Sequence, residues 1–167
     1  MTGAGFEIRI DADPVVQGLR RLRELGGDLT PVMDDIGAML VASTQHRFET
    51  GTGPDGTSWP ESARAKRQGG QTLVDSGRLR DSITHRARGD TVEVGTNVIY
   101  AAIHQFGGTI KPKNAKSLAF PGLDGAPVFV KSVTLPARPF LGVSNDDREE
   151  IAAIVADEVA RSFGGTP

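Results

Sequence analysis

The stretch that decides the fold runs from Leu73 to Gly108 and reads LVDSGRLRDSITHRARGDTVEVGTNVIYAAIHQFGG. Its first five residues predict a turn. A β-hairpin is predicted next, because apolar and polar residues alternate on both sides of Gly89-Asp90, a pair suited to a tight reversal. The segment from Ile99 to Phe106 is short and apolar, with large side chains at three-residue steps, which indicates a helix that ends at Gly107-Gly108.

Before this stretch the sequence predicts a strand and two helices that pack on it. Residues 6–11 alternate apolar and polar, as in a half-buried strand. Asp13-Pro14 and Thr30-Pro31 are helix starts. The first helix ends at Gly26-Gly27 and the second at about Thr50. The expected buried positions are Val15, Leu19, Leu22 and Leu25 in the first helix, and Met33, Ile36, Leu40, Val41, Thr44 and Phe48 in the second.

The loop at residues 51–60, GTGPDGTSWP, contains the one tryptophan of the chain. Its GxGxxG spacing does not predict a nucleotide site, because it follows a helix and Pro54 and Pro60 oppose a helix opening there. Trp59 either fixes the loop to the core of its own chain or anchors a partner. Residues 61–72 carry Arg64, Lys66 and Arg67 and predict a short basic helix or a mobile loop.

After the central stretch the sequence predicts a long connection and one closing helix. Residues 109–127 are rich in Lys, Pro and Gly and predict a long loop or β-arm, and loops of this length are usually functional or mobile. A strand candidate follows at residues 128–135, and two prolines extend residues 136–140. Asn145 is the expected cap of a last helix with an acidic first turn. Its expected buried stripe is Ile151, Ile154, Val155, Val159 and Phe163.

These elements predict an α+β fold with an N-terminal helix pair, a small mainly antiparallel sheet and a C-terminal helix. The 167 residues suit one domain with its own core, and the expected arm at 109–127 is its appendage. The chain has no cysteine, which excludes disulfide scaffolds, thiol catalysis and cysteine zinc sites. No signal peptide is recognisable at the N-terminus, and no stretch is long and apolar enough to span a membrane.

Candidate chemistry is sparse. Asp75-Ser76-Gly77 with a histidine base is compatible with a small serine hydrolase, but a turn or helix cap explains the same residues. The three histidines have no metal-ligand spacing, and neither a metal nor another cofactor is expected. His104 is expected to pack or hydrogen-bond within its apolar segment. A formal net charge of −2 without a dense basic block argues against sequence-wide DNA binding.

The order of these short motifs resembles the phage virion morphogenesis family, the tail completion proteins of Mu-like phages. The resemblance extends from about residue 30 to the end and is weakest at residues 111–130. It is carried by Phe48, Gly53-Pro54-Asp55-Gly56, Trp59-Pro60, Leu73-Val74-Asp75-Ser76-Gly77-Arg78-Leu79, Ser82-Ile83, Val94-Gly95-Thr96, the stretch from Tyr100 to Gly108, and Pro136-Ala137-Arg138-Pro139-Phe140-Leu141-Gly142.

The resemblance implies a non-enzymatic structural protein that completes the tail and helps join head to tail at the neck. Such a protein assembles in the host cytoplasm and stays in the virion. Its implied partners are copies of itself in a ring, expected to be a hexamer, and other neck and tail proteins, while genomic DNA passes through the lumen without specific binding. A tail-tube terminator or a head-side adaptor is the alternative within this class. The expected interaction residues are Pro54, Asp55, Trp59, Lys111, Lys113, Leu118, Phe120, Arg138 and Phe140.

Overall fold

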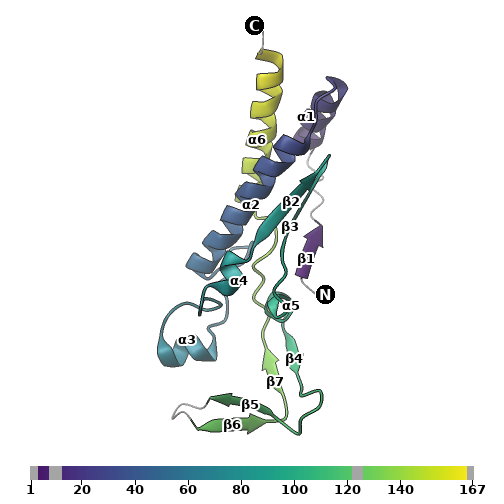
Figure 1. Ribbon diagram of the computed structural model, residues 1–167. Coiled ribbons are helices and arrows are strands. Elements are labelled where there is room, and N and C mark those ends of the chain that lie inside the picture. Colours follow the sequence, from purple (N-terminus) through teal and green to yellow (C-terminus); the bar gives the residue numbers. More distant parts are fainter. Residues whose placement is uncertain (1–3, 8–12, 122–125, 165–167) are drawn as a thin grey trace.

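The computed structural model describes residues 4–7, 13–121 and 126–164, and it has the expected α+β fold (Figure 1). The described helices are α1 (Asp13–Glu24), α2 (Thr30–Thr50), α3 (Ala63–Gln68), α4 (Arg78–Asp81), α5 (Ala101–Phe106) and α6 (Asn145–Gly164). The described strands are β1 (Ala4–Glu7), β2 (Thr84–Arg88), β3 (Thr91–Thr96), β4 (Gly108–Ile110), β5 (Leu118–Pro121), β6 (Pro127–Val130) and β7 (Val133–Leu135).

Helix α2 is the central element of the fold. It packs on the hairpin β2–β3 and also against α6, while α1 packs against α6. Two glycines permit these close approaches. A Cβ atom on Gly37 would lie 2.3 Å from the His85 ring, and one on Gly18 would lie 2.6 Å from Val155. The core therefore forms along α2, which contacts both the β2–β3 hairpin and α6.

The predicted hairpin is confirmed. Strands β2 and β3 pair antiparallel, and the pairing of Arg88 with Thr91 leaves Gly89-Asp90 as a two-residue turn in which Gly89 has a φ of 54°. Strand β1 pairs with the other side of β3, which gives the order β1-β3-β2. The predicted strand at 6–11 is confirmed for its first two residues, and residues 8–12 lie outside the described part.

The predicted helix ends at the paired glycines and near Thr50 are also confirmed. Gly26 has a φ of 76°, and the Gly27 amide donates to the Leu22 carbonyl at 3.1 Å. Gly51 closes α2 in the same left-handed region, with its amide 2.8 Å from the Arg47 carbonyl oxygen. The predicted burial of Leu25 and Phe163 is wrong, because they are 55% and 61% exposed. Both lie at helix ends, and periodicity indicates a face but not how far the neighbouring element covers it.

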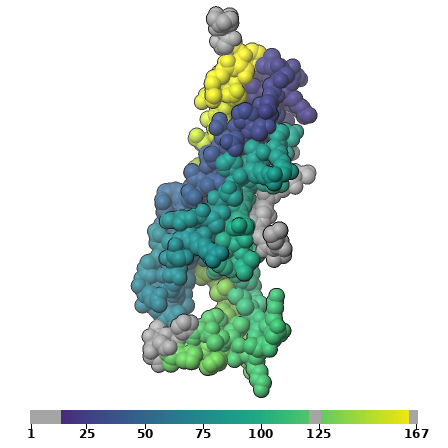
Figure 2. All heavy atoms as spheres, in the orientation of Figure 1, coloured from purple at the N-terminus to yellow at the C-terminus, as the bar shows by residue number. Residues whose placement is uncertain are grey.

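The segment from Gly108 to Leu135, called the arm below, contains the strands β4, β5, β6 and β7, where the sequence predicts a long loop or β-arm followed by one strand. Strands β4 and β7 pair antiparallel at its base, and β5 and β6 pair antiparallel beyond them. The single strand predicted at 128–135 is therefore two strands. Figures 1 and 2 show the arm at one end of an elongated molecule, away from α1 and α6.

Candidate functional site

Trp59 holds its loop to the core. Its side chain is 7% exposed, its indole N–H donates to the Pro139 carbonyl at 2.9 Å, and its ring meets Phe48 edge-on at 5.5 Å. Phe140 is fully buried and also stacks on Phe48. Trp59 and Phe140, two of the expected interaction residues, therefore do not expose their rings to a partner in this conformation.

The rest of the 51–60 loop is compact and lies close to the start of α6. Asp55 is exposed and accepts hydrogen bonds from the amide and hydroxyl of Thr57, at 3.0 and 2.9 Å. These bonds lower the pKa of Asp55, so the loop presents a carboxylate to solvent. Pro54 lies against Gly142, where an added Cβ would approach its ring to 2.6 Å. Pro54 and Asp55 line a groove of about 940 Å³ formed by this loop, α2 and the start of α6.

A buried ion pair joins α2 to α6. The Arg47 guanidinium donates to the Asp147 carboxylate and, through its other nitrogen, to the carbonyls of Phe140 and Gly142 at 3.0 and 2.9 Å. Asp147 also accepts from the Ser43 hydroxyl at 2.5 Å and the Ser144 amide at 2.7 Å. The Asp147 carboxylate and the Arg47 guanidinium thus both find their hydrogen-bond partners within the chain, which indicates a structural role for this ion pair.

The cap of α6 is Ser144, and the expectation for Asn145 is wrong. The Ser144 hydroxyl accepts from the Asp147 amide at 3.1 Å, while the Asp147 carboxylate accepts from the Ser144 amide, which is a capping box. The sequence pattern placed Asp147 in the acidic first turn but did not indicate its burial. A usable signal existed, since Asp147 is in helical phase with the buried Ile151 and Val155.

Gln105 is a second polar residue that the sequence analysis missed. It is buried on α5, donates to the Leu141 carbonyl, and accepts from the amides of Phe140 and Leu141, all at 3.0 Å. The predicted helix at 99–106 is confirmed as α5, but Gln105 and Ala101 face the core. Ile99, Tyr100 and Phe106 are exposed. The size and hydrophobicity of the side chains therefore do not identify the buried face of this helix.

Ser76 does not have the environment of a catalytic serine. Its hydroxyl accepts from the Arg78 amide at 3.4 Å, and no hydrogen bond joins it to a histidine among the described residues. Gly77, with a φ of 79°, opens the short helix α4 directly after it. The turn interpretation explains these residues, and the geometry offers no support for a serine hydrolase.

His104 and Arg138 lie together beside the base of the arm. Arg138, another expected interaction residue, is buried, and its Nε donates to the Pro60 carbonyl at 2.6 Å. His104 packs edge-on against Tyr100 at 5.9 Å, which confirms the packing interpretation. Its Nδ1 atom is buried without a hydrogen-bond partner in the described part of the chain. Burial and the Arg138 charge both lower the pKa of His104.

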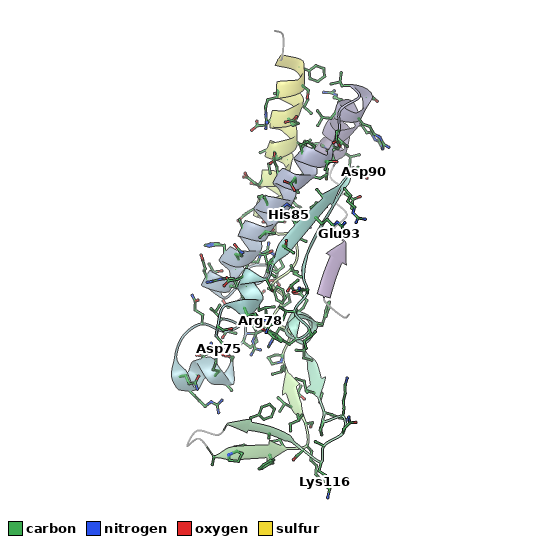
Figure 3. The ribbon with its side chains drawn as sticks, viewed as in Figure 1. Asp75, Arg78, His85, Asp90, Glu93 and Lys116 are labelled. Atoms are coloured by element: carbon green, nitrogen blue, oxygen red, sulfur yellow. The ribbon has the colours of Figure 1, made fainter. Side chains whose placement is uncertain are left out.

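The arm carries the other four expected interaction residues. Lys111 and Lys113 are exposed between β4 and β5, and Phe120 is exposed while Leu118 is half-buried. The register pairs Leu118 with Val130 and Phe120 with Val128 on one face of the hairpin, and Ala119 with Phe129 on the other. Figure 3 shows Lys116 at the far end of the arm. The arm therefore presents apolar side chains flanked by lysines.

Metal and membrane signals are both missing from the part of the chain that the structure describes. No group of three or more His, Asp or Glu side chains there could hold a metal ion. None of the described helices has the length and apolar character needed to cross a membrane.

Comparison with known proteins is informative at the sequence level, whereas no solved structure matches significantly. The chain is 32% identical over 153 residues to Mu-like prophage FluMu G protein 2 of Haemophilus influenzae, covering 91% of this chain and 94% of that protein. It is 32% identical over 135 residues to putative capsid assembly protein G of Escherichia phage Mu, covering 75% and 76% of the two chains. The profile of the phage virion morphogenesis family matches residues 10–160. The chain therefore belongs to the phage virion morphogenesis family.

Proposed function

We propose that this chain completes the phage tail and joins it to the head at the neck, as a non-enzymatic component of a homo-oligomeric ring. The observation that carries the proposal is the arm. It projects from the body and presents apolar side chains that the described residues leave exposed. Membership of a virion morphogenesis family supports an assembly role for that surface.

The arm hairpin is poorly supported by its own chain. A two-stranded hairpin with solvent on both faces is marginal in water, because it buries little apolar area. Phe129 is 65% exposed on one face, and Phe120 and Val128 are exposed on the other. Covering these side chains on assembly would remove apolar area from water, and each Å² contributes about 25 cal/mol. The arm is thus suited to contact another subunit.

The charge distribution supports contact between copies of the chain. The arm contains four lysines and one aspartate, whereas α6 contains six acidic residues and two arginines. Charges of opposite sign on different parts of one surface favour head-to-tail contacts between copies. A head-to-tail interface that closes on itself forms a ring. The hexameric ring size stays a proposal taken from the family resemblance.

An arm-closed variant tests the proposed function. Residues 111–132 are replaced by Asn-Gly, which links Ile110 to its partner Val133 as a tight hairpin and keeps the β4–β7 pairing. We expect the purified variant to unfold at the temperature of the natural chain, since none of the arm's described residues belongs to the buried core. We expect lysates of a phage that carries it to contain separate filled heads and tails.

The control is Leu25→Ser, which removes a 55% exposed apolar side chain that lies outside the arm, directly after α1. This control is expected to give joined particles. Joined particles from the arm-closed variant would contradict the assembly role of the arm. Tail lengths in the same micrographs separate joining from termination, because loss of a terminator gives tails of irregular length.

A further inference from the structure

Arg138 is a buried cation without a counter-charge. Arg138 is 4% exposed, and no carboxylate forms an ion pair with its side chain in the described ranges 4–7, 13–121 and 126–164. The single side-chain hydrogen bond of Arg138 within these ranges runs from Nε to the Pro60 carbonyl, so the two terminal nitrogens of the guanidinium have no partner among the same residues. Burial without a counter-charge lowers the pKa of Arg138. An unpaired buried charge is costly, which makes this position unusual.

Arg138 lines a depression of about 320 Å³. Arg138, His104 and Tyr100 line one part of it, and Arg78 and Leu79 of α4 line another. Arg78 is exposed, and its guanidinium has no partner in the part of the chain described here. His104, whose Nδ1 atom has no hydrogen-bond partner among the described residues, lines the same depression. The depression thus gathers two uncompensated cations and one unsatisfied polar atom.

The chain's own carboxylate does not occupy the depression. Asp75 is the acidic residue in the lining, and its side chain is 81% exposed. Its carboxylate lies 3.8 Å from Arg64, which is already held by the carbonyls of Gln71 and Val74 at 2.5 and 2.7 Å. Figure 3 shows Asp75 and Arg78 at the edge of the body, near α3 and α4. Asp75 therefore leaves Arg138 uncompensated.

We propose that this depression binds an Asp or Glu side chain of a neighbouring protein subunit in the assembled particle, with Arg138 as the buried counter-charge and Arg78 at the rim. A guanidinium binds a carboxylate through two parallel hydrogen bonds, which favours this ligand class. The volume accommodates one or two side chains, and a formal net charge of −2 without a dense basic block disfavours a nucleic acid ligand. The proposal rests on the proposed assembly role.

The pairing would contribute specificity more than bulk affinity. A carboxylate that enters the depression compensates a charge that the isolated chain leaves unpaired, whereas a neutral or basic side chain leaves it unpaired. The depression also borders the base of the arm at Leu135. Occupation of the depression and contact by the arm would then occur on adjoining surfaces of one interface.

Substitution at the rim tests the proposal without disturbing the fold. Arg78→Glu places a like charge opposite the incoming carboxylate, and Arg78→Lys keeps the positive charge. We expect Arg78→Glu to lower the yield of infectious particles by at least about tenfold, as for loss of a close interfacial charge pair, and Arg78→Lys to keep most of it. Arg67→Glu, on the exposed surface of α3 outside the depression, is the matched control and is expected to keep full yield.

A cryo-electron microscopy map of the assembled particle gives the direct readout. The expected result is an Asp or Glu side chain from a neighbouring subunit against the Arg138 guanidinium. A depression that faces solvent, an apolar side chain or a DNA phosphate would overturn the proposal, as would full yield from Arg78→Glu. If the arm-closed variant fails to join heads and tails while Arg78→Glu joins them normally, only the depression proposal fails. If the arm-closed variant joins normally, the proposed function fails first.

Discussion

At the scale of single residues, Asp147 makes the sharpest stability prediction. Asp147→Asn leaves the buried Arg47 guanidinium without its counter-charge while keeping nearly the same shape. We expect the free energy of unfolding to fall by about 3 kcal/mol, since breaking a buried pair leaves a charge uncompensated. Urea unfolding followed by circular dichroism measures the change. Asp146→Asn, one residue away and exposed, is the control and is expected to change stability by less than about 0.5 kcal/mol.

The same carboxylate predicts a pH dependence. Burial alone would raise the pKa of Asp147, but hydrogen bonds from Ser43 and Ser144 and the Arg47 charge outweigh it and lower the pKa. A depressed folded-state pKa gives stability that is present above the unfolded value, about 3.9, and is lost as pH falls through the folded value. The stability difference between the natural chain and Asp147→Asn is therefore expected to be constant near neutral pH and to shrink below about pH 4. A difference that grows on acidification would contradict this assignment.

Substitutions of Trp59 distinguish a role in the core of the chain from a role in binding a partner. Trp59→Ala is expected to destabilise the chain by about 3–5 kcal/mol, because it removes a buried ring from Phe48 and a hydrogen bond to Pro139. Trp59→Phe keeps a ring and loses the hydrogen bond, so its expected cost is about 1–2 kcal/mol. Thermal unfolding measures both changes. A Trp59→Ala protein with unchanged stability that fails to assemble would restore the surface-anchor interpretation.

Single residues also show where sequence reasoning stops. The pattern identified the apolar core positions Ile36, Leu40 and Phe48, because their spacing marks one helix face. It did not identify Arg47, Gln105 or Asp147, since polar residues break a hydrophobic pattern even when they are buried. Their hydrogen bonds go to residues up to 104 positions away, and a local pattern contains no information about such partners.

At the scale of elements, the contact between α2 and β2 depends on one missing side chain. Gly37→Ala is expected to destabilise the chain by about 1–3 kcal/mol, because the new Cβ would lie within 2.6 Å of two His85 ring atoms. Alanine is otherwise the better helix former by about 1 kcal/mol. Chemical unfolding of Gly37→Ala alone and together with His85→Ala measures the effect. The double variant is expected to recover part of the loss, and a stabilised single variant would show that the two elements can move apart.

The hairpin and the helices could be predicted as elements, whereas the arm could be predicted only as a long segment. Gly89-Asp90 and the flanking alternation determine β2 and β3 locally. The arm pairs Gly108 with Leu135 across 26 intervening residues, with a second hairpin inside the connection. The residues that form β6 and β7 read as one strand, because Lys131-Ser132 interrupts the chain without a glycine or proline.

At the scale of the whole molecule, the two ends of the fold differ in chemistry. The arm is basic with exposed apolar side chains, and α6 at the other end of the body is acidic. The expected interaction residues divide accordingly. Those in the arm lie on the surface, whereas Trp59, Arg138 and Phe140 hold the 51–60 loop and the chain before α6 in place. Which subunits meet these surfaces depends on partners whose sequences this chain does not contain.

Electron microscopy of lysates from a phage that lacks this chain tests the central claim most directly. A chain that completes the tail and joins it to the head is required after both parts have formed. The expected result is therefore filled heads and separate tails in the same lysate, with joined particles restored when the chain is supplied in trans. Normal numbers of joined, infectious particles in the absence of the chain would contradict the account.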